Sequence, residues 1–412
     1  MKILNFGSCN IDYVYSLEHI VVPGETLAAS KREVFPGGKG LNQSVAAARA
    51  GAQVFHAGVI GADGAMLRAV LEDSGCDTRY LESVDCPNGH AIIQVASNAQ
   101  NSIFLFEGTN GMVTEAMIDR VLGNFGAGDI LLLQNEISNV PYLIRRGHEM
   151  GMTVVFNPAP FDESLLSLDL NMVDYLILNE VEASGFFGSE EVAKILAAAA
   201  KWEKLQIVVT LGRDGCVYTD GKKTCVCPAF QVEAVDTTAA GDTFAGYYVA
   251  MLADGKTVEE ALRYGCAASA LAVSAMGAAP SIPTLERVEA ALLRLSPYPI
   301  PGEDKEEALR QRIVGYIQSD LSSASLKGLA TILGYSKSYT GSRVKALTGQ
   351  TFGDLLQRLR CEKAAAMLRT TDESVSGIIR CVGYQNESFF RTAFKAIYGE
   401  TPLQYKKKHM GG

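Results

Sequence analysis

The sequence predicts an α/β domain built on a mostly parallel sheet, followed by a smaller domain made only of helices. Three observations support this prediction. Short apolar runs alternate with helical patterns through about the first 295 residues, a proline-rich segment then interrupts the chain, and the remainder contains helical patterns and an internal repeat. A chain of 412 residues is long enough for two or three domains, each with its own hydrophobic core.

Six short apolar runs have the length and composition of buried strands. They cover residues 3–6, 54–59, 130–133, 153–156, 175–178 and 207–210, and helical patterns such as residues 43–50 and 192–201 lie between them. This alternation is typical of a parallel sheet with helices on both faces. Residues 26–35 and 91–106 instead alternate or pair around turn residues, which indicates a small β lid set apart from the main sheet.

The composition is that of a soluble globular chain, with 48% apolar and 20% charged residues. No apolar run reaches the roughly 18 residues needed to cross a bilayer, and the first residues enter a strand pattern rather than a signal peptide. We therefore expect a cytoplasmic protein with no membrane partner. The nine cysteines form an odd count, and Cys225 and Cys227 have no His or second Cys pair at metal-ligand spacing, so we expect reduced thiols.

The charge is uneven along the chain. Residues 303–412 hold 17 Lys and Arg against 11 Asp and Glu, whereas the whole chain has a net charge of -9. An acidic body joined to a basic tail suggests that one part handles small molecules and the other approaches a polyanion. Three prolines and a glycine between residues 297 and 302 predict a stiff linker. We therefore place domains at residues 1–296 and 307–412, with a linker at 297–306.

Three segments at predicted strand ends carry residues suited to chemistry, because ligands of open α/β sheets lie beyond the carboxyl ends of the strands. The first, Gly-Gly-Lys-Gly-Leu-Asn at residues 37–42, precedes a helix, and its glycines allow the backbone to approach a ligand closely. In the second, Asn179 and Glu182 place an amide and a carboxylate three residues apart, which can hold hydrated Mg²⁺ and phosphate oxygens. Taken singly, a structural turn and ordinary surface side chains explain these two segments equally well.

The third segment, residues 236–244, places small residues ahead of an apolar helix. Ala239, Ala240 and Gly241 leave unpaired N–H groups beside the positive end of the helix dipole, an arrangement that suits a phosphate. A carboxylate at this place, Asp242, is better suited to taking a proton from an attacking hydroxyl than to holding a phosphate. The alternative is that Asp242 merely caps the helix.

Together these segments resemble the ribokinase (PfkB-type) sugar kinases. Five motifs carry the resemblance, in the same order and spacing over residues 1 to about 295: Gly7-Ser8-x-Asn10-x-Asp12, Gly-Gly-Lys-Gly-x-Asn at 37–42, Asn-x-x-Glu at 179–182, Thr210-Leu211-Gly212-x-x-Gly215 and Asp-x-x-Ala-Ala-Gly-Asp at 236–242. The resemblance implies a ribokinase-like three-layer α/β sandwich with a small β lid, ATP as phosphoryl donor, Mg²⁺, and K⁺ as an activating cation.

The resemblance also implies roles for individual positions. Asp242 matches the general base, and Ala239, Ala240 and Gly241 match the anion hole. The other implied positions are sugar-binding Asn10, Asp12, Gly37, Gly38, Lys39, Asn42 and Glu136; nucleotide-binding Asn179, Glu182, Thr210, Gly212, Gly215, Gly241 and Cys266; and potassium-caging Asp236, Thr238, Ala272, Ala275, Gly277 and Ser281. Cys266 departs from the polar or imidazole side chain that ribokinases often place beside the adenine.

The same resemblance bears on the substrate. The sequence Ala-Ala-Gly-Asp at the anion hole, Glu136, and the segments 157–160 and 277–281 are similar to ribokinases proper. They favour D-ribose, phosphorylated on its primary 5-hydroxyl. Fructose, deoxyribose and nucleosides remain alternative substrates.

An internal repeat organises the C-terminal domain. Ile332-Leu333-Gly334-Tyr335-Ser336 recurs 49 residues later as Cys381-Val382-Gly383-Tyr384-Gln385, and each copy continues into a helical stretch rich in Lys or Arg. A helix, a glycine turn and a second helix form a helix-turn-helix unit, whose second helix enters the major groove of DNA. We predict that Ser325 and Ser374 cap the leading helices, that residues 337–347 and 386–398 form the second helices, and that residues 351–369 form one long connecting helix.

This domain resembles the AraC-type DNA-binding domain over about residues 307–408, most specifically at residues 382–395 and in Tyr398-Gly399-x-Thr401-Pro402. The resemblance implies binding to specific sequences of double-stranded DNA and control of transcription, usually as a homodimer. The expected DNA contacts are polar side chains of the two second helices: Lys337, Ser338, Thr340, Ser342, Arg343, Lys345, Asn386, Arg391 and Lys395. The aromatic residues Tyr335, Tyr384, Phe389, Phe390 and Phe394 are expected to be core residues.

Two functions from different classes are compatible with this organisation. The first is an active sugar kinase that carries its own DNA-binding domain. The second is an AraC-type transcription regulator whose inactive kinase fold senses a sugar or a nucleotide. A pure sensor needs neither the base at Asp242 nor the anion hole, and since both are present, we expect catalysis with regulation as a second activity.

Overall fold

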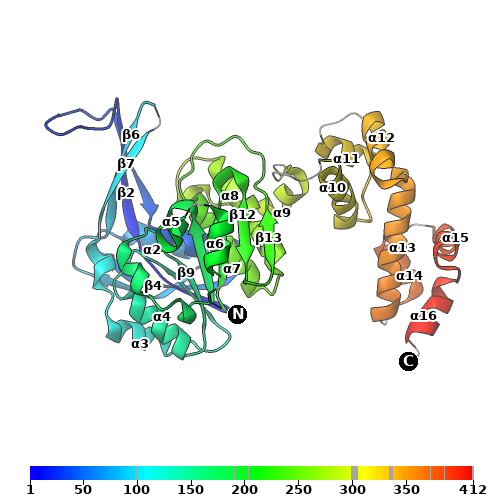
Figure 1. Cartoon of the computed structure of the whole chain (residues 1–412), viewed down its shortest axis with the longest axis horizontal. Helices are drawn as coiled ribbons and strands as arrows, with labels where there is room; N and C mark the ends of the chain where they lie inside the picture. Colours follow the sequence, from blue (N-terminus) through cyan, green and yellow to red (C-terminus); the bar gives the residue numbers. More distant parts are fainter. Residues whose placement is uncertain are drawn as a thin grey trace. The chain divides into compact units, whose positions relative to one another are not determined.

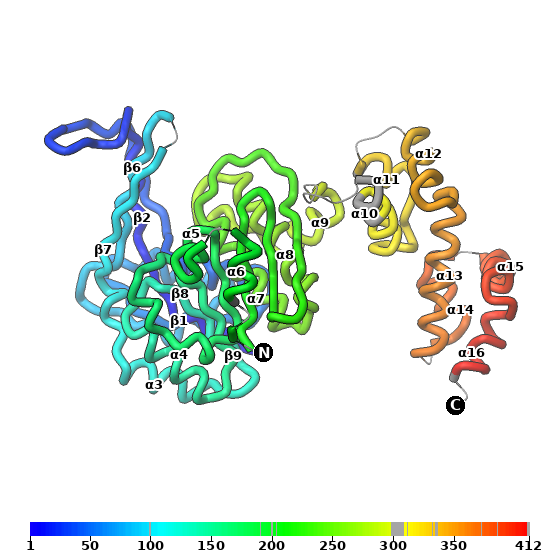
Figure 2. Tube along the Cα trace, in the orientation of Figure 1, coloured from blue at the N-terminus to red at the C-terminus, as the bar shows by residue number. Residues whose placement is uncertain are grey.

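The largest element of the computed structural model is a nine-stranded sheet with the strand order β13-β12-β11-β10-β9-β8-β1-β4-β5. Neighbouring strands from β11 to β5 in this order are parallel to one another. β12 pairs antiparallel with β11, and β13 pairs antiparallel with β12. Their bounds are β1 (Lys2–Phe6), β4 (Gln53–Gly61), β5 (Asp77–Val84), β8 (Ile130–Gln134), β9 (Thr153–Asn157), β10 (Tyr175–Asn179), β11 (Gln206–Thr210), β12 (Cys216–Thr219) and β13 (Thr224–Cys227). All six predicted runs are confirmed as strands. In the sheet order β1 lies between the later strands β8 and β4, and Figure 2 shows β1 beside β8.

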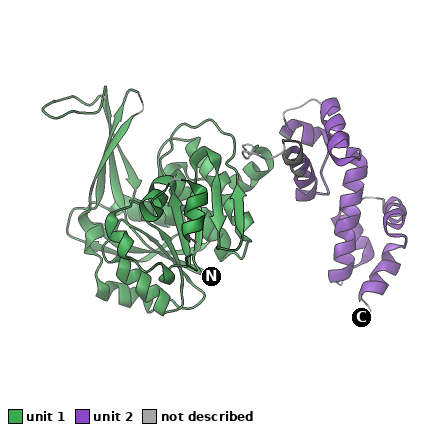
Figure 3. Ribbon diagram, viewed as in Figure 1, with its two compact units in different colours: residues 1–298 green, residues 299–412 purple. Residues whose placement is uncertain are grey.

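The structure describes residues 1–98, 100–189, 191–199, 201–202, 204–297, 305–333, 337–371, 373–384 and 386–410. The chain divides into two units, residues 1–298 and 299–412 (Figure 3). Residues 298–304, within the predicted linker, lie outside the described residues, as do Gly334, Tyr335, Ser336 and Gln385 of the predicted helix-turn-helix turns. Among the described residues, no helix has the length and apolar character that a membrane crossing requires.

Helices cover both faces of the main sheet, as predicted, because alternate strand residues point to opposite faces. In β8, Ile130 and Leu132 belong to one buried core, whereas Leu131 and Leu133 belong to the other. The first core includes residues of α1 (Lys39–Arg49), α2 (Ala65–Asp73), α7 (Ala240–Ala253), α8 (Val258–Val273) and α9 (Leu285–Arg294). The second core includes residues of α3 (Glu115–Leu122), α4 (Val140–Glu149), α5 (Glu180–Phe187) and α6 (Val192–Ala199).

A second sheet forms the lid and projects from the body of the first unit (Figure 1). Its strand order is β3-β2-β6-β7, with β2 (Asn10–Leu17), β3 (Lys31–Gly37), β6 (His90–Ala96) and β7 (Asn101–Phe106). The hairpin predicted at residues 91–106 is confirmed, whereas residues 26–30 lie outside any strand and β2 was not predicted. β2 lies in the lid, where several of its residues are partly exposed. It therefore lacks the continuous apolar run by which a strand buried on both faces can be predicted.

The second unit contains only helices among its described residues. They are α10 (Lys305–Ser319), α11 (Leu326–Leu333), α12 (Lys337–Thr348), α13 (Phe352–Thr370), α14 (Val375–Cys381), α15 (Glu387–Tyr398) and α16 (Pro402–Met410). Leu355 and Leu359 of α13 belong to a core with α10–α12, and Ala364 and Leu368 to a core with α14–α16. The predicted connecting helix is therefore confirmed.

The leading helices of both repeats are capped as predicted. Ser325 Oγ accepts a hydrogen bond from Gly328 N at 3.1 Å, and Ser374 Oγ accepts one from Gly377 N at 3.0 Å. Each cap satisfies an N–H group that the first turn of a helix leaves unpaired.

Candidate functional site

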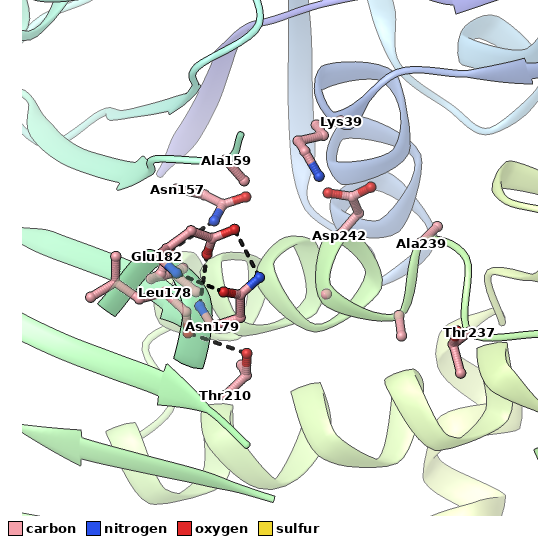
Figure 4. A pocket seen from close by; sticks show the side chains of 13 residues that line it. Lys39, Asn157, Ala159, Leu178, Asn179, Glu182, Thr210, Thr237, Ala239 and Asp242 are labelled. Atoms are coloured by element: carbon pink, nitrogen blue, oxygen red, sulfur yellow. Dashed lines mark hydrogen bonds between the residues drawn. The ribbon is translucent and has the colours of Figure 1, made fainter. Parts of the chain in front are cut away.

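A cavity of about 210 Å³ opens between the carboxyl ends of β9, β10 and β11 and the N-terminus of α7 (Figure 4). Its lining brings together segments that lie far apart in the sequence. The lining residues are Lys39, Asn157, Ala159, Ile177, Leu178, Asn179, Glu182, Thr210, Thr237, Ala239, Ala240, Gly241 and Asp242. Eight of them were predicted as site residues: Lys39, Asn179, Glu182, Thr210, Ala239, Ala240, Gly241 and Asp242.

Asp242 lies in the first turn of α7 and is buried. Its Oδ2 accepts a hydrogen bond from Asn42 Nδ2 at 3.0 Å, and its Oδ1 accepts one from Gln43 Nε2 at 3.0 Å. No side-chain cap is present at the start of α7, so the capping alternative for Asp242 finds no support among the described contacts. The carboxylate is instead held in one orientation by two amide donors.

The turn before α7 presents backbone N–H groups to the cavity. Ala239 adopts a left-handed conformation with φ of 59°, and Ala240 N donates to Thr237 O at 3.2 Å. The N–H groups of Gly241 and Asp242 belong to the first helical turn, which an α-helix leaves without intrahelical partners. These two N–H groups, together with the positive end of the helix dipole, can bind an anion. Ala240 N, predicted as part of the anion hole, is instead bonded within the turn.

Gln43 is a site residue that the sequence analysis missed. Its Nε2 also donates to Asn157 Oδ1 at 2.9 Å, and its Oε1 accepts from Gln134 Nε2 at 2.7 Å. Gln134 Nε2 lies 3.2 Å from Asn5 Oδ1. Amides at Asn5 and Gln134, within apolar strands, were the available sequence signal, because a buried polar side chain is stable only when it is hydrogen-bonded.

Asp12, in β2, carries a second buried carboxylate near Asp242. Among the described residues, none donates a hydrogen bond to it. Burial, followed by the negative charges of Glu136 and Asp242, raises the pKa of Asp12 to about 7. Gly37 permits this close packing, since a Cβ atom there would lie 2.0 Å from Asp12 Oδ2.

Asn42 supplies another buried acceptor. Its Nδ2 is bonded to Asp242, whereas its Oδ1 has no hydrogen-bond partner among the described residues. The unsatisfied Oδ1 and the Asp12 carboxylate can both accept hydrogen bonds from the hydroxyl groups of a ligand. The structure thus places two free acceptors near the fixed carboxylate of Asp242.

Glu136 holds the glycine loop in place. Its Oε2 accepts hydrogen bonds from Ser8 Oγ at 2.6 Å and from Lys39 N at 2.9 Å. Gly38 has φ of +93°, and a Cβ atom at Gly40 would lie 2.3 Å from Ser8 N, so both positions require glycine. Asn10 Oδ1 is occupied in a similar way, because it accepts from Asn110 Nδ2 at 2.7 Å.

Lys39 points toward Asp242 in the cavity (Figure 4). The negative charge of Asp242, supported by those of Glu136 and Glu182, raises the pKa of the Lys39 ammonium against the opposing effect of burial. Lys39 therefore brings a positive charge to a cavity whose other charged lining residues are Glu182 and Asp242, and this charge suits an anionic ligand.

Asn179 and Glu182 form the capping box of α5. Asn179 Oδ1 accepts from Glu182 N at 2.9 Å, and Glu182 Oε2 accepts from Asn179 N at 2.7 Å. Both side chains also line the cavity, and burial raises the pKa of Glu182. The pair therefore has a structural role in addition to any ligand contact.

Gly212 and Gly215 both have positive φ, and a Cβ atom at Gly215 would lie 2.1 Å from Cys227 O. Thr210 Oγ1 donates to Leu178 O at 3.2 Å. Cys266 does not line the cavity. It is buried in the core with its Sγ 3.6 Å from Cys216 Sγ, because its face of α8 packs on the β12–β13 edge of the sheet.

The residues predicted to cage a cation are brought together from two loops. Asp236 Oδ1 accepts from Thr238 N at 2.9 Å and Thr238 Oγ1 at 2.6 Å, and its Oδ2 accepts from Gly277 N at 2.9 Å. Ala272 lies in the last turn of α8, and its carbonyl oxygen accepts a hydrogen bond from Ala275 N at 3.1 Å. Ser281 Oγ donates to Ala278 O at 2.8 Å. The bond between Asp236 and Gly277 thus joins the two loops, and their backbone carbonyl oxygens are of the ligand type that suits a hard cation.

In the second unit, most predicted DNA contacts are accessible. Lys337, Ser338, Ser342, Lys345, Asn386 and Lys395 are exposed, and Arg343 and Arg391 are half-buried. Arg391 pairs with Glu387 at 3.1 Å, and Asn386 Oδ1 caps α15 by accepting from Phe389 N at 3.1 Å.

Two predictions about this unit were wrong. Thr340 is fully buried, because it lies one helical turn before Val344 on the face of α12 that packs into the core. Phe389, expected in the core, is 59% exposed on α15, whereas Tyr384, Phe390 and Phe394 are buried as expected.

Comparisons with known proteins agree with this geometry. The profile of the pfkB family of carbohydrate kinases matches residues 1–285, and that of a helix-turn-helix domain matches residues 329–408. The chain is 38% identical over 291 residues to a ribokinase of Haemophilus influenzae, covering 68% of this chain and 94% of that protein.

Solved structures give the same result. A ribokinase of Cryptococcus neoformans in complex with ADP superposes with a TM-score of 0.63 at 35% identity, covering 70% of this chain and 98% of its own. A ribokinase of Arabidopsis thaliana complexed with ribose and ATP superposes with a TM-score of 0.62 at 31% identity, covering 71% of this chain and 98% of its own.

The raised pKa of Asp12 predicts an effect of pH on stability. The folded carboxyl, with a pKa of about 7, keeps a proton that the unfolded chain releases near pH 4, so the free energy of unfolding falls as pH rises through this window. We expect Asp12→Asn to stabilise the first unit above pH 7 by at most about 4 kcal/mol, with the gain vanishing near pH 4.

Urea unfolding followed by the fluorescence of Trp202, the single tryptophan, measures this difference in the first unit alone. Asp85→Asn, at an exposed carboxylate, is the control and should show no such pH dependence. Equal stability of wild type and Asp12→Asn at every pH would contradict the assignment.

Proposed function

Because this chain belongs to the pfkB family of carbohydrate kinases, we propose that its first unit phosphorylates the primary 5-hydroxyl of D-ribose with ATP, and that its second unit binds specific DNA sequences to control transcription. The chain is an ATP-dependent sugar kinase by its family, and its C-terminal domain is of the AraC helix-turn-helix type. The observation that carries the catalytic proposal is the buried Asp242 carboxylate, fixed by Asn42 and Gln43 at the start of α7.

In this proposal, Asp242 accepts the proton of the attacking sugar hydroxyl. The amide donors of Asn42 and Gln43 keep its carboxylate aimed at one position, which is the geometric requirement for a general base. The N–H groups of Gly241 and Asp242 and the ammonium of Lys39 stabilise negative charge on the phosphoryl group during transfer. Asp242→Asn removes the proton acceptor and preserves the size of the side chain.

The sugar binds through the two acceptors that lack partners, Asp12 and Asn42 Oδ1. A carboxylate can accept hydrogen bonds from two hydroxyls at once, so Asp12 suits a sugar with neighbouring hydroxyl groups. Gly38 and Glu136 complete this side of the site, Glu136 by fixing the loop that carries Lys39. The similarity to ribokinases, one of which is complexed with ribose and ATP, supports ribose as the sugar.

The nucleotide binds on the other side of the cavity, against Asn179 and Thr210, and extends toward Gly212, which follows the end of β11. Glu182 faces the same space and is suited to holding the water shell of Mg²⁺, which would neutralise phosphate oxygens. K⁺ would bind to carbonyls of the loops joined by Asp236 and Gly277, directly before the turn that contains Ala239. There it would fix the backbone that forms the anion-binding turn.

DNA binding rests on the exposed polar side chains of α12 and α15. Lys337, Ser342 and Lys345 lie on α12, and Lys395 lies on α15, all exposed. Lys and Arg bind phosphates and read guanine, and short polar side chains contact base edges. Phe389 adds an exposed apolar side chain on α15 that can contact a thymine methyl group.

A homodimer would present two such domains to one operator. The lid supports this state, because β7 is an edge strand whose Ile103, Phe104, Leu105 and Phe106 are each between 50% and 54% exposed. An apolar edge strand of this kind is suited to pairing with a second copy of the chain.

Measurement of ADP formation with D-ribose, 2-deoxy-D-ribose, D-fructose and nucleosides, in Mg²⁺ and K⁺, tests the enzyme. We expect the highest kcat/KM with ribose. We expect Asp242→Asn to lower kcat by about 10²–10⁴ and to leave ribose binding near that of wild type, because the general base contributes to chemistry rather than to affinity.

Asp254→Asn, at the C-terminal end of the same helix, is the matched control and should retain full turnover. A higher kcat/KM with another compound would mean that this compound, and not ribose, is the substrate. Binding of a sugar without turnover would instead make the first unit a sensor.

For the DNA-binding proposal, the full chain first selects its operator from random double-stranded DNA. Arg343→Ala should then weaken operator binding by about 1–3 kcal/mol, the usual cost of losing a base contact. Kinase turnover should not change, since Arg343 belongs to the other unit.

Lys363→Ala, an exposed cation on the connecting helix, should bind more tightly than Arg343→Ala. Failure of the selection, or loss of both activities in Arg343→Ala, would argue against an independent DNA-binding unit.

Light scattering tests the dimer. We expect wild type at twice the chain mass of 44.1 kDa and Phe104→Lys at the monomer mass, because a charge on β7 opposes burial of this edge. Leu166→Lys, at an exposed apolar residue outside the lid, should remain dimeric. A monomeric wild type would refute the proposal.

A further inference from the structure

Three cysteines from three separate elements meet at one edge of the main sheet. They are Cys216 of β12, Cys227 of β13 and Cys266 of α8, and their sulfur atoms all lie within 4.8 Å of one another. The Sγ atoms of Cys216 and Cys266 are 3.6 Å apart. Neither sugar binding nor phosphoryl transfer uses these side chains.

The backbone fixes this arrangement. Cys216 and Cys227 are direct partners in the antiparallel pairing of β12 with β13, so their side chains leave the same face of the sheet next to one another. Helix α8 packs over β13 and places Cys266 against the pair. Because strand register and helix packing position the three sulfur atoms, the cluster does not depend on flexible loops.

The spacing fits coordination of a metal ion. A zinc–sulfur bond of about 2.3 Å in tetrahedral geometry separates two sulfur ligands by about 3.8 Å, close to the observed 3.6 Å between Cys216 and Cys266. Two other roles explain the cluster less well. A disulfide bond would use only two of the three sulfur atoms, and packing of the core would not require that all three residues be cysteines.

The chemistry of the donors selects the class of metal. Among the described residues, the cluster contains only thiols, with no carboxylate or imidazole in it, and it borders the apolar core that includes Tyr218 and Phe244. Thiolates prefer soft ions such as Cu(I) and Zn²⁺, whereas Mg²⁺ and K⁺ require oxygen ligands. The cluster therefore does not compete for the ions that the kinase reaction needs.

We propose that Cys216, Cys227 and Cys266 form a binding site for one soft, thiolate-preferring d¹⁰ metal ion. Binding replaces the three thiol protons, which are released to solvent, by three metal–sulfur bonds. The ion cross-links β12, β13 and α8, and so secures the short strand β13 at the end of the sheet. Gly215 directly precedes Cys216 and packs on the carbonyl of Cys227, so the ion also braces the loop from Gly212 to Gly215.

The test titrates the reduced, chelator-treated full chain with Cd²⁺, a d¹⁰ ion whose thiolate bonds absorb in the ultraviolet. We expect one equivalent to bind, with sulfur-to-metal charge transfer and a rise in the melting temperature of the first unit. Zn²⁺ and Cu(I) should displace the probe, and excess Mg²⁺ should not.

Variants assign the ligands. Cys216→Ala, Cys227→Ala and Cys266→Ala should each lose the charge-transfer band at one equivalent. Cys225→Ala should retain it, because Cys225 lies on the same strand two residues from Cys227 but outside the cluster. The fluorescence of Trp202 reports whether each variant is folded, and the corresponding serine variants replace any alanine variant that is not.

A second measurement on wild type does not depend on variants. The folded chain is alkylated with and without Cd²⁺, and it is then denatured so that mass spectrometry can identify the cysteines that were not alkylated. Cd²⁺ should protect three cysteines, Cys216, Cys227 and Cys266. Absence of stoichiometric binding, binding that survives removal of all three cysteines, or protection of only two thiols would overturn the proposal.

Discussion

Two amide hydrogen bonds hold the Asp242 carboxylate, and they require α1 and α7 to lie unusually close together. Gly246 makes this possible, since a Cβ atom there would lie 2.5 Å from Ala46 Cβ and 2.6 Å from Gln43 O. The apolar, alanine-rich face of α1 buries Ala46 and Ala47 against α7. The contact that builds the core is therefore the contact that brings Asn42 and Gln43 to Asp242.

This arrangement places polar side chains in the core between the sheet and α1. Asn5, Gln43 and Gln134 are buried there, where apolar residues would pack without any need for hydrogen-bond partners. They are stable because they bond to one another, and a network of this kind has defined orientations that an apolar core lacks. The buried carboxylates of Asp12 and Asp242 repel each other in the same region, and Lys39 offsets part of that repulsion.

The two units solve the problem of burying apolar surface in different ways. The first places a sheet between two layers of helices, which leaves the carboxyl ends of its strands open for ligands. The second joins two small helical cores through α13 and keeps polar side chains of α12 and α15 on its surface. A rigid cavity suits a small molecule, whereas exposed helices suit a polymer.

The sequence by itself determined the alternation of strands and helices, the break between the units, the connecting helix and the motifs around Asp242, because these depend on local patterns and on short spacings. Only the tertiary structure decided which side chains meet. Asn42 and Asp242 are 200 residues apart, so nothing near Gln43 marks it as a partner of the same carboxylate.

Helical periodicity alone did not show that Thr340 faces the core and Phe389 the solvent, because the choice depends on which neighbouring helix packs against each face. The spacing of Cys225 and Cys227 gave no metal-ligand pattern, and Cys216 and Cys266 join Cys227 only through strand register and helix packing. Packing between elements far apart in the sequence brings such groups together, and local sequence patterns do not predict which distant elements will pack.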